Sequence, residues 1–254
     1  MSRRVHTFEN GVVVYDDHLL ASQRHRYARR NVHEAEEEDL FVEIIRTLPP
    51  TGCFVNIGGA IGYYALLAKR LSSNLQIHVV EPLQRHREFF EDNVRLNGFS
   101  SVEFEIHPEA VAAADGAVNF IEADYSSVIQ PRSGRSLRDV ISKFLFASRP
   151  ANGSKSHQVT VVNAVTLDSL VAKIERPVDL LQMDVQGSEV DVLRGGSRTL
   201  RSAQVKRFLI GTHGEKIHFE CIEQLRRYNY RIECDRARGH EQPDGILFAT
   251  AHFC

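Results

Sequence analysis

Apolar residues follow two different periods along most of this chain, and the two alternate. Short, almost continuous apolar runs, which are typical of strands buried on both faces, occur at residues 53–57, 75–80, 102–106, 178–184 and 206–213. Stretches with apolar residues three or four positions apart, which are typical of helices, lie at residues 33–48, 63–71, 84–97 and 188–195. Because strand and helix alternate, the pattern predicts an α/β fold. We expect a doubly wound, Rossmann-like, mostly parallel sheet with helices on both faces.

Two segments depart from this alternation. Residues 1–33 are polar and basic, and they predict a hairpin around Asn10-Gly11. Four arginines within residues 22–31 indicate a solvated surface helix, which we prefer to an arm that gates substrate access. Residues 126–157 carry six lysines and arginines against one aspartate, a net charge of +5.

Long insertions inside compact domains are usually lids, binding loops or disordered segments. We therefore interpret residues 126–157 as a basic, lid-like insertion that could attract an anionic substrate, with a disordered surface loop as the alternative. The chain then divides into an N-terminal extension at residues 1–33 and a domain at residues 34–254 that carries this insertion.

The amino-acid composition excludes several classes of protein. A chain of 254 residues with 43% hydrophobic and 25% charged residues suits one large globular domain. Its formal net charge of −2 argues against a general nucleic-acid binder. The four cysteines form no C-x-x-C pair, and no apolar run approaches the roughly 20 residues of a membrane span. We expect a reduced, cytoplasmic protein without structural zinc and without a membrane contact.

A glycine-rich turn follows the first core strand. Gly58, Gly59 and Gly62 separate this strand from a helix that starts at Tyr63. Glycines let the backbone turn sharply and let a ligand approach without meeting a Cβ atom. Glu81 ends the next strand, about 20 residues further on, where such sites keep the acid that binds ribose hydroxyls. This combination favours a nucleoside-type cofactor over an ordinary strand–helix turn, although the G-x-G-x-x-G spacing of a dinucleotide site is missing.

A second group of polar residues lies where later strands end. Asp184 and His213 each end an apolar strand, and Glu189 lies in the first turn of the helix after Asp184. Because the carboxyl ends of parallel strands share one edge of the sheet, we expect these side chains to face the same crevice as Gly58 and Glu81. Taken singly, Glu189 is explained as a helix cap and His213 as a loop histidine. Together they predict an acid/base group.

Several of these motifs resemble one family. Thr166-Leu-Asp-Ser-Leu170 and the run at residues 178–196 resemble the paired T-L-D-S-L and D-L-L-K-x-D-V-E-G-x-E-x-x-V-L-x-G motifs of the FkbM-type methyltransferases. The glycine loop resembles the V-D-x-G-A-N-x-G-Y-Y of that family, and Glu81-Pro82 resembles its E-P. The run at residues 211–214 also resembles the end of the family's domain. The resemblance covers roughly residues 34–250.

The resemblance implies a class I methyltransferase that uses S-adenosylmethionine to methylate hydroxyl groups of small molecules, typically sugars, polyketides or related natural products. It also implies a seven-stranded sheet whose antiparallel last strand comes from residues 246–250.

Roles in methyl transfer follow from this family likeness. Asn56, Gly58, Gly59 and Gly62 are expected to shape the methionine side of the cofactor site, Glu81 to bind ribose, and Glu109 and Ala110 to flank adenine. His213 is our candidate base, with Asp184 and Glu189 in the same catalytic group. A divalent ion at Asp184 and Glu189 is compatible with their oxygen ligands, but nothing in the sequence requires one, so we predict no metal.

The chain departs from the family pattern at three places. Asn56 stands where the family usually has Asp, Gly59-Ala60 replaces Ala-Asn, and Gln182 and Gln186 stand where Lys and Glu are common. These changes predict weaker cofactor binding. They leave two alternatives open: a cofactor-binding partner protein without catalysis, or an RNA methyltransferase that uses the basic insertion and the N-terminal arginines. The sequence identifies neither the acceptor nor the oligomeric state; a homodimer is compatible with it.

Overall fold

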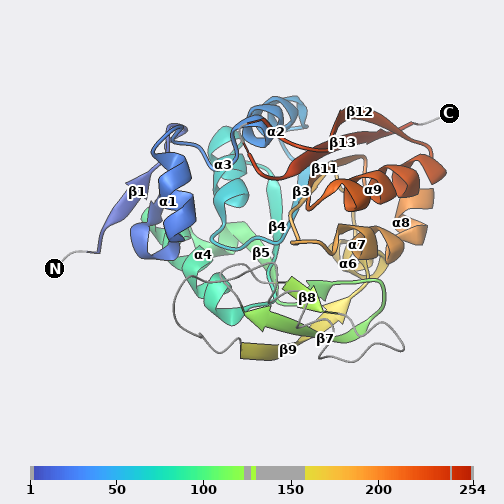
Figure 1. Ribbon diagram of the computed structural model, residues 1–254, viewed down its shortest axis with the longest axis horizontal. Coiled ribbons are helices and arrows are strands. Elements are labelled where there is room, and N and C mark those ends of the chain that lie inside the picture. The colour runs from blue at the N-terminus through green and yellow to red at the C-terminus, as the bar shows by residue number, and fades with distance from the viewer. Residues whose placement is uncertain (1–2, 123–126, 130–157, 241, 253–254) are drawn as a thin grey trace.

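The computed structural model of the protein describes residues 3–122, 127–129, 158–240 and 242–252, and a seven-stranded sheet forms its centre (Figure 1). The strands lie in the order β12-β13-β11-β10-β3-β4-β5. Their bounds are β3 Cys53–Ile57, β4 Gln76–Val80, β5 Phe104–His107, β10 Leu180–Met183, β11 Arg207–Thr212, β12 Tyr230–Arg236 and β13 Gly245–Ala251. Neighbouring strands from β11 to β5 pair in parallel, whereas β13 is antiparallel to both β11 and β12. The predicted fold class and its antiparallel strand are therefore confirmed.

A layer of helices covers each face of this sheet. One layer contains α2 Ala35–Thr47, α3 Tyr63–Leu71 and α4 Gln84–Leu96, and the other contains α6 Leu167–Ile174, α7 Glu189–Arg194, α8 Ser197–Arg201 and α9 Glu215–Arg227. Side chains alternate along β3, so that Phe54 packs into the core with α2, α3 and α4, and Val55 into the core with the later helices. Among the helices of the described ranges, none is long and apolar enough to cross a membrane.

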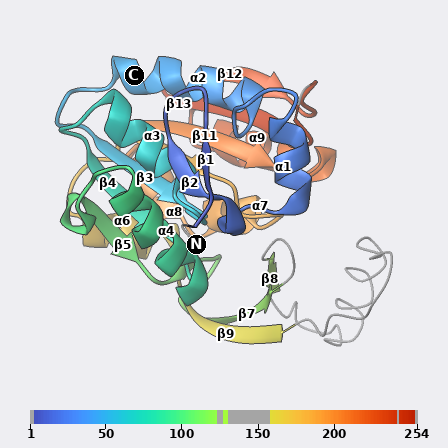
Figure 2. The same ribbon diagram turned by 90° about the vertical axis from the view of Figure 1, so that its left-hand side faces the viewer.

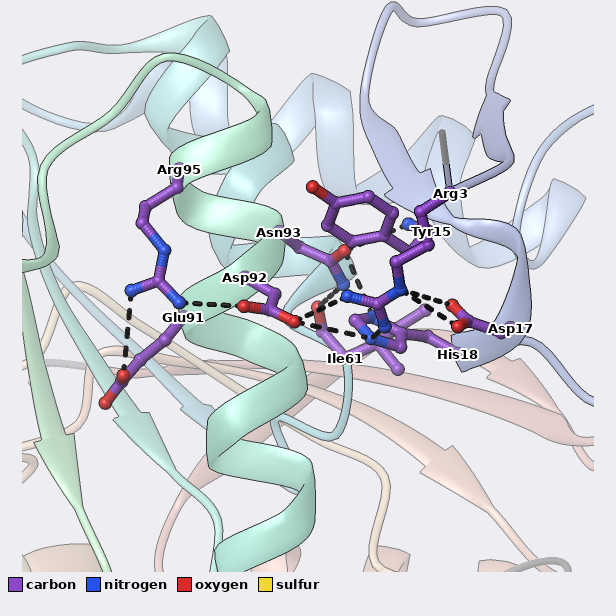
Figure 3. A network of polar contacts seen from close by, with 9 residues as sticks. All are labelled: Arg3, Tyr15, Asp17, His18, Ile61, Glu91, Asp92, Asn93 and Arg95. Atoms are coloured by element: carbon purple, nitrogen blue, oxygen red, sulfur yellow. Dashed lines mark hydrogen bonds and ion pairs between the residues drawn. The ribbon is translucent and has the colours of Figure 1, made fainter. Parts of the chain in front are cut away.

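The N-terminal residues pack against α4. They form the hairpin of β1 Val5–Thr7 and β2 Val13–Tyr15, the 3-10 turn η1 Asp16–His18 and helix α1 Ala21–Tyr27. Figure 3 shows Arg3 between two carboxylates, Asp17 at 2.9 Å and Asp92 of α4 at 2.8 Å. The hairpin predicted around Asn10-Gly11 is confirmed, because Gly11 has a φ of +82° and donates its N–H to the Phe8 carbonyl.

A second, four-stranded sheet was not foreseen. It consists of β6 Ala110–Val111, β7 Gly116–Glu122, β8 Ser127–Ile129 and β9 Gln158–Val165, in the order β6-β9-β7-β8. It lies at the end of the molecule opposite α2 (Figures 1 and 2). Of its strands, only β7 corresponds to an apolar run that the sequence predicts as a short strand, at residues 117–121. Apart from β8, the predicted lid-like insertion at 126–157 lies outside the described residues.

The start of β5 corrects one predicted boundary. Val102 and Glu103, which we expected in the strand, belong to the 3-10 turn η2 Ser101–Glu103. The Ser100 N–H donates to the Glu103 carboxylate over 2.8 Å, which fixes a capping box before the strand begins at Phe104. Val102 is 91% exposed, so its apolar character does not mark a buried strand position.

Candidate active site

A cavity of about 740 Å³ lies at the carboxyl ends of β3, β4, β10 and β11. Crevices at this edge are where open α/β sheets bind ligands. The cavity brings together most of the predicted site residues: Asn56, Gly58, Gly59, Glu81, Glu109, Ala110, Asp184 and His213. Gly62 and Glu189 are not among the described residues that line the cavity. Sequence reasoning missed further residues of its wall, among them Arg26, Glu34, Phe120 and Asp244.

The glycine loop is packed too tightly for side chains. Gly58 has a φ of +84°, and a Cβ atom on it would lie 2.1 Å from the backbone oxygen of Asp184. A Cβ atom on Gly59 would lie 2.3 Å from a methyl group of Val79. Gly62 plays a different part, because its Cβ atom would overlap the Phe90 ring of α4. Gly58 and Gly59 therefore shape the cavity wall, whereas Gly62 lets α3 approach α4.

Glu81 is held in place at the end of β4. Its two carboxylate oxygens accept the backbone N–H groups of Ala60 and Leu83, each over 2.9 Å. The residue is 5% exposed, and it lines the cavity. An ionised carboxylate has about four acceptor positions, so two hydrogen bonds leave capacity for hydroxyl groups of a ligand. On the other side of the cavity, Glu109 pairs with Lys173 over 2.6 Å.

Asn56 and Gln182 form a pair across β3 and β10. The Asn56 side-chain N–H donates to the Gln182 carbonyl over 2.6 Å, and the Gln182 N–H donates in turn to Glu37 over 3.0 Å. Asn56 Oδ1 is buried and has no hydrogen-bond partner within the described residues. The two departures from the family's Asp and Lys are thus one coupled exchange, because the positions are register partners. A buried pair of opposite charges is replaced by a buried pair of neutral amides.

His213 is oriented by Glu189. Its Nδ1 lies 2.7 Å from the Glu189 carboxylate, which is fully buried and also accepts the Gly187 N–H. Its Nε2 lies 3.5 Å from Asp184 and 3.3 Å from Asp244, without a hydrogen-bond partner in the part of the chain that is described. Burial disfavours the imidazolium, but the bond to Glu189 and the nearby carboxylates outweigh it and raise the pKa of His213 to about 9.

The structure thus brings together the three predicted acid/base residues but gives them different positions. His213 and Asp184 line the cavity, whereas Glu189 does not line it and contacts His213 through Nδ1. Glu189 is therefore a positioning residue in this geometry.

Carboxyl groups of α2 extend the site. Acids at the start of a helix usually lie in solvent near its free N–H groups, but Glu34 and Glu37 are both buried, beside Asp184 and Asp244. The side-chain oxygen of Gln242, Oε1, accepts the backbone N–H groups of Glu36 and Glu37 in the first turn of the helix instead. Burial and the charge of Asp184 raise the pKa of Glu37 to about 8, and burial raises the pKa of Asp184 to about 6. At neutral pH, Glu37 therefore stays largely protonated.

Replacing Glu37 by glutamine should change how stability depends on pH. The folded-state pKa of about 8 exceeds the ordinary value of 4.5, so wild-type stability is fully present below pH 4.5 and is lost as pH rises through 8. Glu37→Gln should unfold like the wild type at pH 5, and should be more stable at pH 9 by on the order of 3 kcal/mol. Urea denaturation at both pH values measures this difference. Exposed Glu43→Gln on the same helix is the control, and an equal gain there would contradict the assignment.

Comparison with known proteins adds a family to this geometry. The sequence matches the family described as methyltransferase FkbM domain over residues 53–232. A putative methyltransferase of Jannaschia sp. (strain CCS1) is 29% identical over 193 residues, which are 73% of this chain and 61% of that protein. The AMB antimetabolite synthetase AmbE of Pseudomonas aeruginosa is 23% identical over 219 aligned residues. This match covers 76% of this chain and 10% of that protein. This chain therefore spans less than two thirds of either relative.

Similarity to one solved structure supports the assignment of the fold, and it carries no information about function. The ribosomal protein L11 methylase from Lactobacillus delbrueckii subsp. bulgaricus superposes with a TM-score of 0.50. The two chains are 11% identical, and the match covers 86% of this chain and 79% of that one.

Proposed function

Because the chain belongs to the FkbM methyltransferase family, we propose that it transfers a methyl group from S-adenosylmethionine to a hydroxyl oxygen of a small molecule. Membership of this family supports methyl transfer with S-adenosylmethionine as the donor. The oxygen acceptor is the finer part of the proposal. It is inferred from one observation: His213 lines the cavity with Nδ1 held by Glu189, and its Nε2, beside Asp184 and Asp244, has no hydrogen-bond partner among the described residues.

The residues present fit this cofactor. Gly58 and Gly59 line the cavity with backbone that carries no side chain, and Asn56 Oδ1 is a buried acceptor that still lacks a partner among the described residues. These groups would hold the methionine part. The fixed Glu81 carboxylate would accept the ribose hydroxyls, with Glu109 and Ala110 on the adenine side. When bound, S-adenosylmethionine supplies a methyl carbon on a positively charged sulfur.

A hydroxyl acceptor needs a base, since it must lose a proton as its oxygen attacks. His213 Nε2 would take the hydroxyl proton as the acceptor oxygen receives the methyl group that bound S-adenosylmethionine would supply. Glu189 keeps the ring in the tautomer whose Nε2 can accept that proton, because Nδ1–H donates to its carboxylate. Alignment of oxygen, carbon and sulfur by the cavity wall supplies much of the remaining acceleration.

The charge of the cavity wall supports a small molecule over RNA. Glu34, Asp184 and Asp244 lie close together on the wall, with one oxygen of each within 4.8 Å of the others. Carboxylates in such a group repel a phosphate backbone, which nucleic-acid sites attract with basic residues. The likeness to a protein named an antimetabolite synthetase supports a natural product as the acceptor class. The basic residues on which the RNA alternative depends lie mostly outside the described residues.

Cofactor binding is tested with a variant of Glu81. We expect Glu81→Ala to bind S-adenosylhomocysteine about 10- to 100-fold more weakly than the wild type in calorimetric titration, because the ribose hydroxyls lose a charged acceptor. Exposed Glu88→Ala is the matched control and should bind normally. Unchanged affinity in Glu81→Ala would contradict the assigned ribose site.

The acceptor class is tested by turnover. Paired substrates that differ only in carrying a hydroxyl or an amino group are incubated with the enzyme and S-adenosylmethionine, and carbon NMR locates the new methyl group. Methylation of oxygen is expected. Methylation of the amines alone would refute the proposal, and normal cofactor binding without turnover on any pair would favour the non-catalytic alternative.

A further inference from the structure

Two histidines and a glutamate converge on the edge of the main sheet, away from the cavity. His78 lies on β4, and Glu105 and His107 lie on the edge strand β5. His78 Nδ1 is 3.1 Å from His107 Nε2. The Glu105 carboxylate lies 3.5 Å from the first nitrogen and 3.8 Å from the second. None of the three lines the cavity that the described residues form.

The register of the two strands produces this convergence. His78 is the direct partner of Glu105, and His107 is the partner of Val80, two positions further along both strands. Residues two apart on a strand point to the same face of the sheet, so all three side chains share one face. Because the backbone fixes both strands, the three ligand atoms need little rearrangement to meet a common ion.

We propose that His78, Glu105 and His107 bind a divalent transition-metal ion, with zinc the best fit. Ligand atoms on a tetrahedral zinc ion with bonds of about 2.0–2.1 Å are about 3.3–3.4 Å apart. His78 Nδ1 and His107 Nε2 lie 3.1 Å apart, one Glu105 oxygen lies 3.5 Å from the first nitrogen, and the other oxygen lies 3.8 Å from the second. The donor groups are therefore spaced close to that value. Two imidazoles and one carboxylate form a donor set that zinc takes, with a fourth position left for water.

The surroundings suit a metal ion in two further respects. Both histidines are buried, so packing holds their rings in place for coordination. Glu105 has a side chain that is 62% exposed, so an ion can enter from solvent. The expectation that this protein lacks structural zinc rested on its cysteines, which this site does not use.

An ion at this place would clamp the edge strand. The Glu81 N–H already donates to the His107 carbonyl over 3.1 Å, directly where β4 and β5 end. Glu81 and Glu109, which face the cavity, follow His78 and His107 by three and two residues. The ion would therefore fix the relative positions of two residues of the cavity wall. It is a structural site and takes no part in methyl transfer.

Binding is tested on the full chain after treatment with a chelator and dialysis. One zinc ion per chain should bind in calorimetric titration, and cobalt(II) in its place should give the intense visible bands of tetrahedral coordination. Glu105→Ala and His78→Asn should each weaken zinc binding by about 100-fold, because each removes one of three ligands. Glu105 is exposed, so its variant keeps the fold, which circular dichroism verifies.

Two controls separate this site from other histidines and carboxylates. His25→Asn and Glu91→Ala remove exposed groups elsewhere, and both should bind zinc like the wild type. Zinc binding that survives unchanged in Glu105→Ala and His78→Asn would place the ion elsewhere and overturn the proposal. Absence of binding by the wild type would also overturn it, and would leave the two histidines as a simple hydrogen-bonded pair.

Discussion

The His213→Gln variant is expected to lose turnover by about 10²- to 10⁴-fold in kcat, which is the usual contribution of a positioned base. Its affinity for S-adenosylhomocysteine should stay at the wild-type value, because the proposed cofactor contacts lie at Asn56, Gly58 and Glu81. Calorimetric titration measures the affinity, and initial rates with an acceptor that the wild type methylates measure kcat. A loss of cofactor binding that accounts for the loss of rate would contradict the role of His213 as the base.

The dependence of this rate on pH provides a second readout. A base acts only when it is unprotonated, and the pKa of His213 is raised to about 9. Wild-type activity should therefore rise from pH 6 towards pH 9, and His213→Gln should lose this dependence. Exposed His252→Gln, as a control, should keep both the rate and the pH profile. Glu189→Gln should shift the profile to lower pH, since it removes a charge that favours the imidazolium.

The Gly58→Ala variant is expected to lose cofactor binding and stability together. Its methyl group would lie 2.1 Å from the Asp184 backbone oxygen, and alanine would also have to adopt a φ of +84°. Since the obstacle is backbone, the loop or β10 must move, and affinity for S-adenosylhomocysteine should fall by about 100-fold or more. Titration calorimetry measures this affinity, and urea denaturation should show a loss on the order of 3 kcal/mol.

Gly98→Ala is a matched control for this variant. Gly98 has a similar φ of +76°, but a Cβ atom on it would meet nothing within 4 Å. The Gly98→Ala substitution should lower the free energy of unfolding only by the backbone strain, about 1 kcal/mol, and should leave cofactor affinity unchanged. If both alanine variants bound S-adenosylhomocysteine like the wild type, the close approach at Gly58 would not matter for the cofactor.

The main sheet could be predicted because local signals and tertiary contacts agree there. The strand at residues 53–57 and the helix at residues 63–71 match β3 and α3 in both bounds, since an apolar run, glycines and a helical apolar run follow one another. The second sheet was missed because its long strand β9 follows directly on the basic insertion, and because its apolar residues do not mark one buried face: Val159 and Val161 are exposed.

Within the site, the sequence located residues better than it assigned their contacts. Strand ends identified Glu81, Asp184 and His213, because parallel topology brings such ends to one edge. The sequence could not reveal that Glu37 is buried, because acids in the first turn of a helix are normally solvated. Nor could it pair Asn56 with Gln182, which lie 126 positions apart and meet only once β3 and β10 are side by side.

That amide pair also constrains how the chain can evolve. A single mutation of Asn56 to aspartate would bury a carboxylate against the neutral Gln182 amide, without a cation opposite it, which costs several kcal/mol. A lysine at position 182 would meet Glu37, which already accepts the Gln182 N–H, so its charge would have a partner from the start. The order of mutations therefore matters: a charged pair at these two positions is accessible when the lysine comes first, and is closed off when the aspartate comes first.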